Sequence, residues 1–322
     1  MELDLGRNGD HDLLVKVAWL YYVADCNQEQ IASRLGLSRF KITRLLARAR
    51  EQGIVKIFID QQSTETLALA EHLARAYGLT ECIVTPALDA EAPDADEVAR
   101  NGVGMAAASF LVRRLQGFDH VTIGLGWGRT IAAMVQAFPS MAKPNARFVS
   151  LMGSLSRAAR SNPFDVVHAL AQACSGEAYL LPAPIIADTE ADFDVLMSQT
   201  IVREALAIGT MADFSIASFG SCSRDSLAAQ YGLLTESEIK ELIGTGAVGD
   251  MLGKFFNKRG ELVPSSLNRR TPSIPLESIR ERELVLLGAG LKKRDALRAV
   301  LRSGIVNRLI VDGNLALAVL DG

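Results

Sequence analysis

Segments typical of strands and of helices alternate along most of this chain, and this alternation limits the fold more than any other feature. Stretches typical of strands lie at residues 82–85, 120–124, 147–152, around 179, and at 214–219, 283–287 and 308–311. Segments with helical spacing lie at 67–77, 98–115, after Arg129, at 164–174, 193–206, 236–243, 294–302 and at the C-terminus. Chains with this order form a mainly parallel sheet covered by helices on both faces. We therefore predict a doubly wound, mainly parallel α/β domain over residues 61–322.

A different pattern occupies the first 60 residues, where helical segments follow one another. Residues 11–24 carry apolar side chains at helical spacing, and residues 28–52 are typical of two short helices separated at Gly36. Asn27, with Gln30 three residues later, and Ser38 are suitable N-caps for this pair. Residues 54–59 alternate as a short strand or wing would. We predict an all-α helix-turn-helix domain over residues 1–60, with a polar joint at 61–64.

The second helix of this pair has one apolar and one basic face. Four apolar residues between Ile42 and Ala49 fall at helical spacing and are expected to face inward. Residues 28–56 contain seven Lys or Arg and two Glu, a local net charge of +5 in a chain with a formal net charge of -3. Binding to DNA phosphates requires such a local concentration of positive charge. The alternative interpretation is a solvated basic helix with no DNA partner.

Double-stranded DNA is therefore the expected partner of this domain. The candidate DNA-binding residues are Gln28, Ser38, Arg39, Phe40, Lys41, Thr43, Arg44 and Arg48. We expect Arg39, Phe40, Thr43 and Arg44 to contact base edges, because they lie on the outward, N-terminal part of the second helix. Lys41, Arg48 and Arg50 are expected to bind phosphates.

The composition excludes several other classes of protein. A hydrophobic content of 49% with 22% charged residues indicates a globular chain that can bury a core. The four cysteines show no CxxC spacing and no pairing with histidine, so we expect free thiols, a reducing compartment and no metal site. No signal peptide and no apolar stretch of about 18 residues is present, so we expect a cytoplasmic protein without a membrane partner.

Glycine-containing turns at the ends of the predicted elements indicate a ligand pocket. The clearest is residues 124–130, GLGWGRT, and the others are at 151–154, 219–221, 246–250 and 288–293. Glycines allow close approach of the backbone, and a helix start offers unpaired N–H groups. The pattern is neither a Walker A loop nor a G-x-G-x-x-G fingerprint, so we expect no nucleotide and no cofactor. A small polar pocket for a polyhydroxylated ligand is the prediction, and purely structural glycines are the alternative.

Five stretches, taken in order, carry a family resemblance. They are QEQIASRLGLSRFKITRLLARAREQGIVKIFI, IGLGWGRTI, LMGSL, GAVGDMLGKFFNKRGELV and GAGLKKRDALRAVLRSGIVNRLIVD. In these stretches the chain resembles the SorC family of sugar-binding transcriptional regulators over nearly its whole length. The resemblance implies a carbohydrate-sensing domain similar to sugar-phosphate isomerases of the glucosamine-6-phosphate deaminase type. It also implies a homotetramer with paired DNA-binding domains on palindromic half-sites, expected to repress a sugar or polyol catabolic operon.

The same resemblance implies roles for residues in the turns. Arg129 and Thr130 would contact the ligand, Asp250 would hold hydroxyl groups, and Lys293 would reach an anionic group. Members that bind phosphorylated sugars tend to carry a basic residue where this chain has Met152, so we expect an unphosphorylated sugar or a polyol as the effector. A sugar phosphate is the alternative effector, because Arg129 and Lys293 could supply two partners for a phosphate. The candidate ligand-binding residues are Gly126, Trp127, Gly128, Arg129, Thr130, Met152, Gly153, Ser154, Gly220, Asp250 and Lys293.

An enzyme is the alternative function, as a sugar-phosphate isomerase, deaminase or aldolase with an attached DNA-binding domain. Such an enzyme would need a general base or a Schiff-base lysine in the pocket. No histidine falls in the glycine turns, and we expect His168 to be packed in the core. Lys292 and Lys293 are the only lysines in the predicted glycine turns. We therefore predict no catalytic residues.

Overall fold

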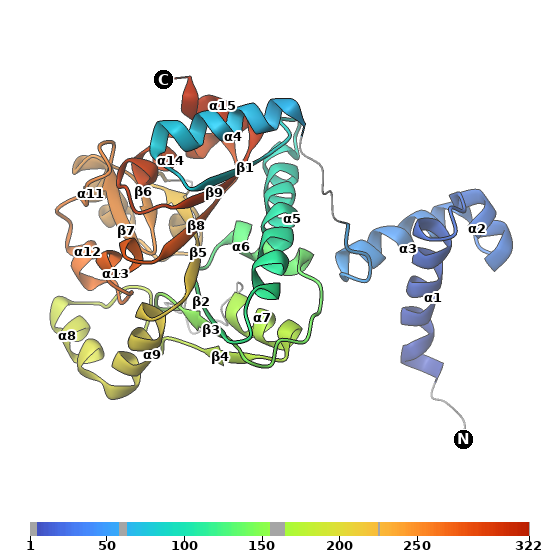
Figure 1. Cartoon of the computed structure of the whole chain (residues 1–322), viewed down its shortest axis with the longest axis horizontal. Helices are drawn as coiled ribbons and strands as arrows, with labels where there is room; N and C mark the ends of the chain where they lie inside the picture. The colour runs from blue at the N-terminus through green and yellow to red at the C-terminus, as the bar shows by residue number, and fades with distance from the viewer. Residues whose placement is uncertain (1–4, 58–62, 155–164, 225, 322) are drawn as a thin grey trace. The chain divides into compact units, whose positions relative to one another are not determined.

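The protein divides into two compact units, residues 1–58 and 59–322. A computed structural model describes residues 5–57, 63–154, 165–224 and 226–321 (Figure 1). The division falls close to the point where the sequence changes from successive helices to alternating strands and helices.

The small unit is a bundle of three helices, α1 (Leu5–Tyr22), α2 (Gln28–Leu35) and α3 (Arg39–Glu51). The side chain of Asn27 accepts hydrogen bonds from the backbone N–H groups of Glu29 and Gln30, and the Gln30 side chain accepts one from Asn27. Gly36, with φ 64°, ends α2 in the left-handed conformation that glycine adopts without strain. The predicted caps and helix pair are therefore present.

The predicted wing is not a strand over residues 54–57. These residues form bends and irregular backbone, and residues 58–59 lie outside the described part of the chain. The N–H groups of Ile54 and Val55 donate to the carbonyl of Ala49, so they are satisfied by the end of α3. Both side chains pack against the core of the small unit.

The large unit is built on a sheet whose seven principal strands are all parallel to their neighbours. This arrangement confirms the predicted fold class. The order across the sheet is β1 (Glu81–Thr85), β9 (Arg308–Asp312), β8 (Glu283–Gly288), β5 (Phe214–Ser221), β2 (Val121–Leu125), β3 (Ala146–Ser150) and β4 (Glu177–Tyr179).

Helices cover both faces of this sheet, because successive residues of each strand enter different cores. Leu284 and Leu286 of β8 belong to one apolar cluster, whereas Val285 and Leu287 belong to the other. The first cluster includes buried residues of α4 (Thr64–Tyr77), α9 (Thr200–Thr210), α14 (Arg294–Arg302) and α15 (Gly313–Leu320). The second includes buried residues of α5 (Ala95–Gln116), α6 (Arg129–Ala137) and α7 (Val166–Cys174).

The single helix predicted over residues 193–206 is wrong. Two helices occupy this region, α8 (Glu190–Ser198) and α9, and they are separated by Gln199 in an extended conformation. The α9 helix buries Val202, Ala205 and Leu206 and contacts β3, whereas α8 has no buried residue. The break therefore separates a helix that packs on the sheet from one that lies outside the core.

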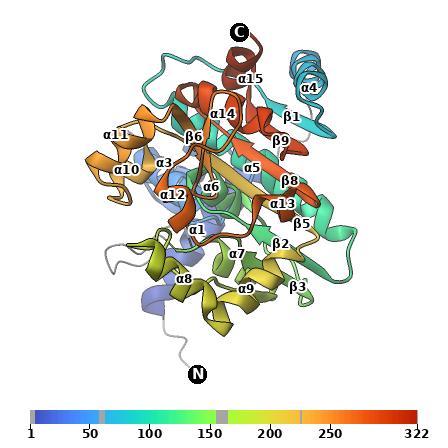
Figure 2. The ribbon, with the colours of Figure 1, turned by 90° about the vertical axis from the view of Figure 1, so that its left-hand side faces the viewer.

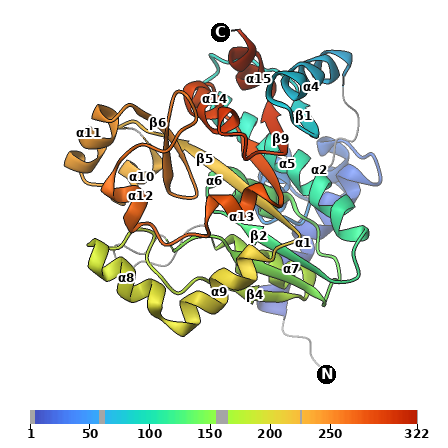
Figure 3. The same ribbon diagram turned by 60° about the vertical axis from the view of Figure 1, so that its left-hand side comes forward.

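The turn predicted over residues 246–250 is also wrong beyond Gly246. Residues 247–251 form β6 (Ala247–Met251), which pairs antiparallel with the end of β5 and with β7 (Lys254–Asn257). The tight turn lies later, at Leu252 and Gly253, which both have positive φ. Figures 2 and 3 show β6 beside α11 (Glu236–Gly244). The remaining helices are α10 (Leu227–Gln230), α11 (Glu236–Gly244), α12 (Ser266–Arg270), α13 (Leu276–Arg280) and the 3-10 turn η1 (Leu291–Lys293).

Candidate functional site

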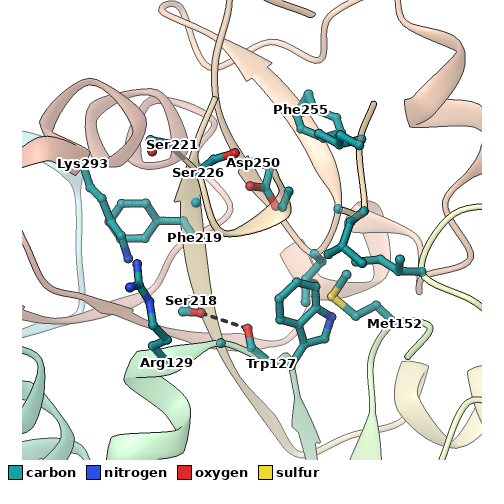
Figure 4. A pocket seen from close by; sticks show the side chains of 18 of the residues that line it. Trp127, Arg129, Met152, Ser218, Phe219, Ser221, Ser226, Asp250, Phe255 and Lys293 are labelled. Carbon is teal, nitrogen blue, oxygen red and sulfur yellow. Dashed lines mark hydrogen bonds between the residues drawn. The ribbon is translucent and has the colours of Figure 1, made fainter. Parts of the chain in front are cut away.

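A cavity of about 100 Å³ lies beyond the carboxyl ends of β2 and β3, beside the last part of β5. Its walls come from the turns that follow these strands, from the β6–β7 hairpin and from η1. This is the position at which open parallel sheets bind ligands, because several loops meet there. Figure 4 shows the side chains that line it.

One end of the cavity is cationic. Arg129 enters from the first residue of α6 and Lys293 from η1, and Figure 4 shows their nitrogen atoms pointing toward each other. The Lys293 Nζ atom also lies 5.5 Å from the centre of the Phe219 ring. Within the described part of the chain, neither cation has an ion-pair partner within 4 Å. The pair is therefore available to an electron-rich group of a ligand.

The environment of Lys293 lowers the pKa of its ammonium group to about 8. Burial is the largest cause, followed by the positive charges of Arg129 and Arg100. Asp250 and Asp96 act in the opposite direction. A bound anionic or hydroxyl oxygen would relieve this repulsion between cations.

Asp250 provides a carboxylate in the same cavity. Burial raises its pKa to about 6, although the N–H of Gly253 and the charge of Lys293 partly offset this rise. Asp250 lies opposite Gly220 in the β5–β6 pair. A Cβ atom at position 220 would overlap the Asp250 Oδ1 atom, so the glycine leaves the space that the carboxylate occupies. The hairpin turn and Gly220 thus place an acceptor for ligand hydroxyl groups.

Apolar side chains form the remaining walls of the cavity. Trp127 and Met152 lie on one side (Figure 4), and the Ser218 hydroxyl donates a 3.1 Å hydrogen bond to the backbone carbonyl of Trp127. The other apolar contacts come from Ile185, Ile186, Leu233, Leu234, Leu252 and Phe255. A carboxylate, two cations and apolar walls together suit a small ligand with hydroxyl groups on a carbon chain.

The structure brings most of the predicted ligand-binding residues into this cavity. Those that line it are Trp127, Gly128, Arg129, Thr130, Met152, Gly220, Asp250 and Lys293. Gly126, Gly153 and Ser154 line an adjacent cavity instead, which shares Trp127 with the first. The N–H groups of Gly153 and Ser154 donate to the carbonyls of Pro272 and Ala183, which holds this turn against neighbouring loops.

Other lining residues were absent from the sequence prediction. Ser218 precedes Gly220 by two residues in β5, so strand periodicity could have indicated it. Phe255 pairs with Asp250 across the hairpin, and no local signal indicated this pairing. The placement of His168 in the core is wrong, because this residue is exposed on the side of α7 opposite to its buried residues.

The basic face of the small unit is exposed as predicted. Ile42, Leu45, Leu46 and Ala49 are buried, whereas Ser38, Arg39, Phe40, Lys41, Thr43 and Arg44 are exposed. Phe40 is 73% exposed, which is unusual for a large aromatic side chain and favours contact with a partner.

Two hydrogen bonds position residues beside this face. The Thr43 hydroxyl donates to the Gln28 Oε1 atom at 2.9 Å and to the carbonyl of Arg39 at 3.1 Å. Arg48 forms an exposed ion pair with Asp10 at 2.8 Å. Thr43 and Gln28 therefore join α3 to the first residue of α2, and Arg48 joins α3 to α1.

Comparisons with known proteins agree with this combination of units. Residues 61–321 match the family model of a sugar-binding domain named Sugar-bind. The erythritol catabolism regulatory protein EryD of Brucella abortus is 37% identical over 313 residues, which cover 97% of this chain and 98% of that protein. The chain belongs to the SorC family of sugar-binding transcriptional regulators. The resemblance carried by the five sequence stretches is thus confirmed.

Two other regulators are similar over nearly the whole chain. The deoxyribonucleoside regulator of Bacillus subtilis is 27% identical, covering 96% of this chain and 97% of that protein. The crystal structure of the full-length sorbitol operon regulator SorC from Klebsiella pneumoniae has a TM-score of 0.71 and 27% identity, and covers 97% of this chain and 100% of that chain. These proteins are named as regulators, so the comparisons do not favour the enzyme alternative.

Two further findings concern the described residues alone. None of their helices is long and apolar enough to span a membrane. None of their His, Cys, Asp and Glu side chains form a group of three or more that could hold a metal ion.

Proposed function

We propose that this SorC-family regulator is a polyol-responsive repressor, in which a ligand bound near Arg129, Asp250 and Lys293 weakens the binding of α3 to operator DNA. The ligand class is supported by one observation: a single cavity combines the Asp250 carboxylate, two cations that form no ion pair within 4 Å among the described residues, and apolar walls. Carboxylate and cation would bind successive hydroxyl groups, and the walls would contact the carbon chain. The protein would act in the cytoplasm, where it meets DNA.

The names of two relatives support a polyol. One regulates erythritol catabolism and the other a sorbitol operon. We propose the unphosphorylated form, because Met152 stands at the apolar wall and leaves a phosphate dianion with Arg129 and Lys293 as its partners. Burying a dianion is costly unless several charged or hydrogen-bonding groups satisfy it.

A thermal-shift screen tests the ligand class. The panel contains erythritol, ribitol, sorbitol, erythritol 4-phosphate and inorganic phosphate. A ligand that binds only the folded protein stabilises it by about 2.7 kcal/mol at one hundred times its Kd. We expect erythritol to raise the Tm, and Asp250→Asn to reduce this rise. A larger rise with erythritol 4-phosphate that is lost in Lys293→Met would contradict the unphosphorylated form while supporting the same site.

A DNA-binding measurement tests the regulatory direction. A DNA fragment selected from a random library is titrated with the protein and followed by fluorescence anisotropy, with and without the stabilising ligand. We expect the ligand to weaken DNA binding between about 5-fold and 150-fold, the usual range for coupled sites. Tighter DNA binding in the presence of ligand would make the protein an activator or a co-repressor-dependent regulator.

A further inference from the structure

Arg270, the last residue of α12, connects three segments that form walls of the ligand cavity. Its side chain is 11% exposed and does not itself line the cavity. Figures 1 to 3 show α12 between α11 and α8, the two helices that follow the segments in question. A buried guanidinium offers several donors in a fixed plane, so it can hold separate segments in one geometry.

The first connection is to the segment that carries Ile185 and Ile186, which line the cavity. The Arg270 Nη1 atom donates to the carbonyls of Ala187 at 2.6 Å and Asp188 at 2.8 Å. The N–H of Ala187 donates in return to the carbonyl of Arg270 at 2.8 Å. Three hydrogen bonds therefore attach this wall to the end of α12.

The second connection is to the segment that carries Leu233 and Leu234, which line the cavity from another side. The Arg270 Nη2 atom donates to the Glu238 Oε1 atom at 3.1 Å. The Glu238 Oε2 atom accepts from the N–H of Thr235 at 2.8 Å, in the capping box that starts α11. One carboxylate thus links Arg270 to the residue that directly follows Leu234.

The third connection runs through α12 to the hairpin that carries Asp250. The Asn268 Oδ1 atom accepts from the N–H of Phe255 at 2.7 Å, and the Thr271 hydroxyl donates to the carbonyl of Gly253 at 3.2 Å. Gly253 and Phe255 both line the cavity. The α12 helix is therefore fixed to the hairpin, and Arg270 fixes the other two walls to α12.

We infer that Arg270 is a positioning residue that sets the width of the ligand cavity by holding the 185–188 and 233–238 segments against the β6–β7 hairpin. Its loss leaves both segments attached only through their other contacts, so the cavity widens and admits solvent. Where the inference concerns a polyol, it rests on the proposed function. Where it concerns cavity width, it stands without any ligand.

Trp127 reports cavity width, because the chain has two tryptophans and the other is Trp19 in the small unit. The test uses the full chain carrying Trp19→Phe, so that Trp127 is the only tryptophan that fluoresces. Acrylamide quenching is measured in Arg270→Met, Arg270→Lys and the control Arg269→Met. Arg269 pairs with Glu190 through side chains that are both more than half exposed, so the control removes a neighbouring arginine without touching the buried connections.

We expect the quenching constant of Trp127 to rise at least twofold in Arg270→Met, to rise less in Arg270→Lys, and to stay unchanged in Arg269→Met. Lysine keeps the charge but cannot donate to both sides at once. A lower Tm with unchanged quenching in folded Arg270→Met would overturn the inference, since a merely stabilising role predicts that result. If Arg270→Met does not fold, Arg270→Lys and Glu238→Gln decide, and unchanged quenching in both overturns it.

Polyol binding gives a second readout on the same proteins. We expect wild type to bind erythritol more tightly than sorbitol, and Arg270→Met to reduce this preference at least fivefold because the wider cavity fits the longer chain. An unchanged preference despite increased quenching would show that the two segments do not set ligand size. If no polyol binds the wild type but the quenching change is present, the proposed ligand class is wrong and the role of Arg270 in cavity width holds.

Discussion

At the scale of single residues, the cavity contains a carboxylate in an environment that disfavours its ionised form. Asp250 is kept beside Gly220 by strand pairing, and burial raises its pKa to about 6. The raised pKa means that the folded protein binds a proton more tightly than the unfolded chain. The contribution of Asp250 to stability is therefore lost as the pH rises from about 4 to about 6. A ligand whose hydroxyl groups donate to the carboxylate offsets this cost.

Ligand binding should accordingly depend on pH through Asp250. We expect polyol affinity to fall about tenfold between pH 7 and pH 5, because the ionised fraction of a group with a pKa of about 6 changes by that factor. Asp250→Asn should bind weakly with little pH dependence, and should raise the Tm of the ligand-free protein at pH 7. Calorimetric titration and thermal melts at both pH values measure these effects. If polyol affinity kept its full pH dependence in Asp250→Asn, a group other than Asp250 would be responsible for it.

Gly220→Ala should disturb the same carboxylate without a large loss of stability. The added Cβ atom meets the end of the Asp250 side chain, which can rotate away, rather than fixed backbone. We expect at least a tenfold loss of polyol affinity, with DNA binding in the absence of ligand unchanged. The control is Gly244→Ala, because Gly244 has open space beside it and no positive φ. Gly232→Ala is unsuitable because Gly232 has a positive φ, which alanine adopts only with strain. Equal polyol affinity in Gly220→Ala and Gly244→Ala would contradict this role for Gly220.

At the scale of elements, α3 separates its functions by position. Its buried stripe packs on α1 and α2, and most of its N-terminal residues are exposed. A recognition helix contacts base edges with such residues, and its later basic residues contact phosphates. This division is a proposal that mutations can test.

Arg44→Ala should weaken binding to the preferred DNA sequence by about 1–3 kcal/mol and relax base preference. Arg48→Ala should weaken binding to all DNA sequences and reduce the slope of log affinity against log salt concentration by about 1. The Arg48 side chain must also leave Asp10 to bind phosphate, so Asp10→Asn should tighten binding slightly. Anisotropy across a series of mutated DNA sites and salt concentrations measures these effects, with Lys16→Ala on α1 as the control. An equal loss on every sequence for Arg44→Ala would defeat its assignment to base contacts.

At the scale of the whole molecule, regulation by a ligand requires that the cavity and α3 influence each other. We propose a homotetramer that places paired small units on palindromic half-sites. Sedimentation measurements should give a mass near four times 34.7 kDa. Inserting about five base pairs between half-sites should abolish cooperative binding, because this rotates one site by half a helical turn. A monomeric chain that binds single half-sites with full affinity would contradict the assembly.

Coupling between the two sites must also be reciprocal. If the polyol raises the Kd for DNA by a given factor, DNA must raise the Kd for the polyol by the same factor. Arg129→Met, which removes one cation from the cavity, should reduce polyol affinity and leave DNA affinity without ligand unchanged. Titrations of ligand with and without DNA measure both factors. Unequal factors would show that the ligand also binds a second site.

The sequence by itself determined the features that depend on a few neighbouring residues. Asn27, Gln30, Gly36 and Ser38 specify the two helices of the DNA-binding pair through local hydrogen bonds and backbone freedom, and all were predictable. The parallel sheet was predictable for a similar reason, because the apolar periodicity within each segment indicates whether it is a strand or a helix. The positions of residues that follow predicted strands, such as Arg129, are therefore predictable from the sequence.

Only the tertiary structure decided features that depend on pairing between distant segments. The β5–β6 register places Asp250 against Gly220, and the neighbouring cavity, not the first one, receives Gly126 and Ser154. Arg270 gave no signal in the sequence, since its partners Ala187 and Glu238 are more than 30 residues away. The physical reason is that a cavity is shaped by which segments pack together, and this choice minimises the free energy of the whole unit and not of any single element.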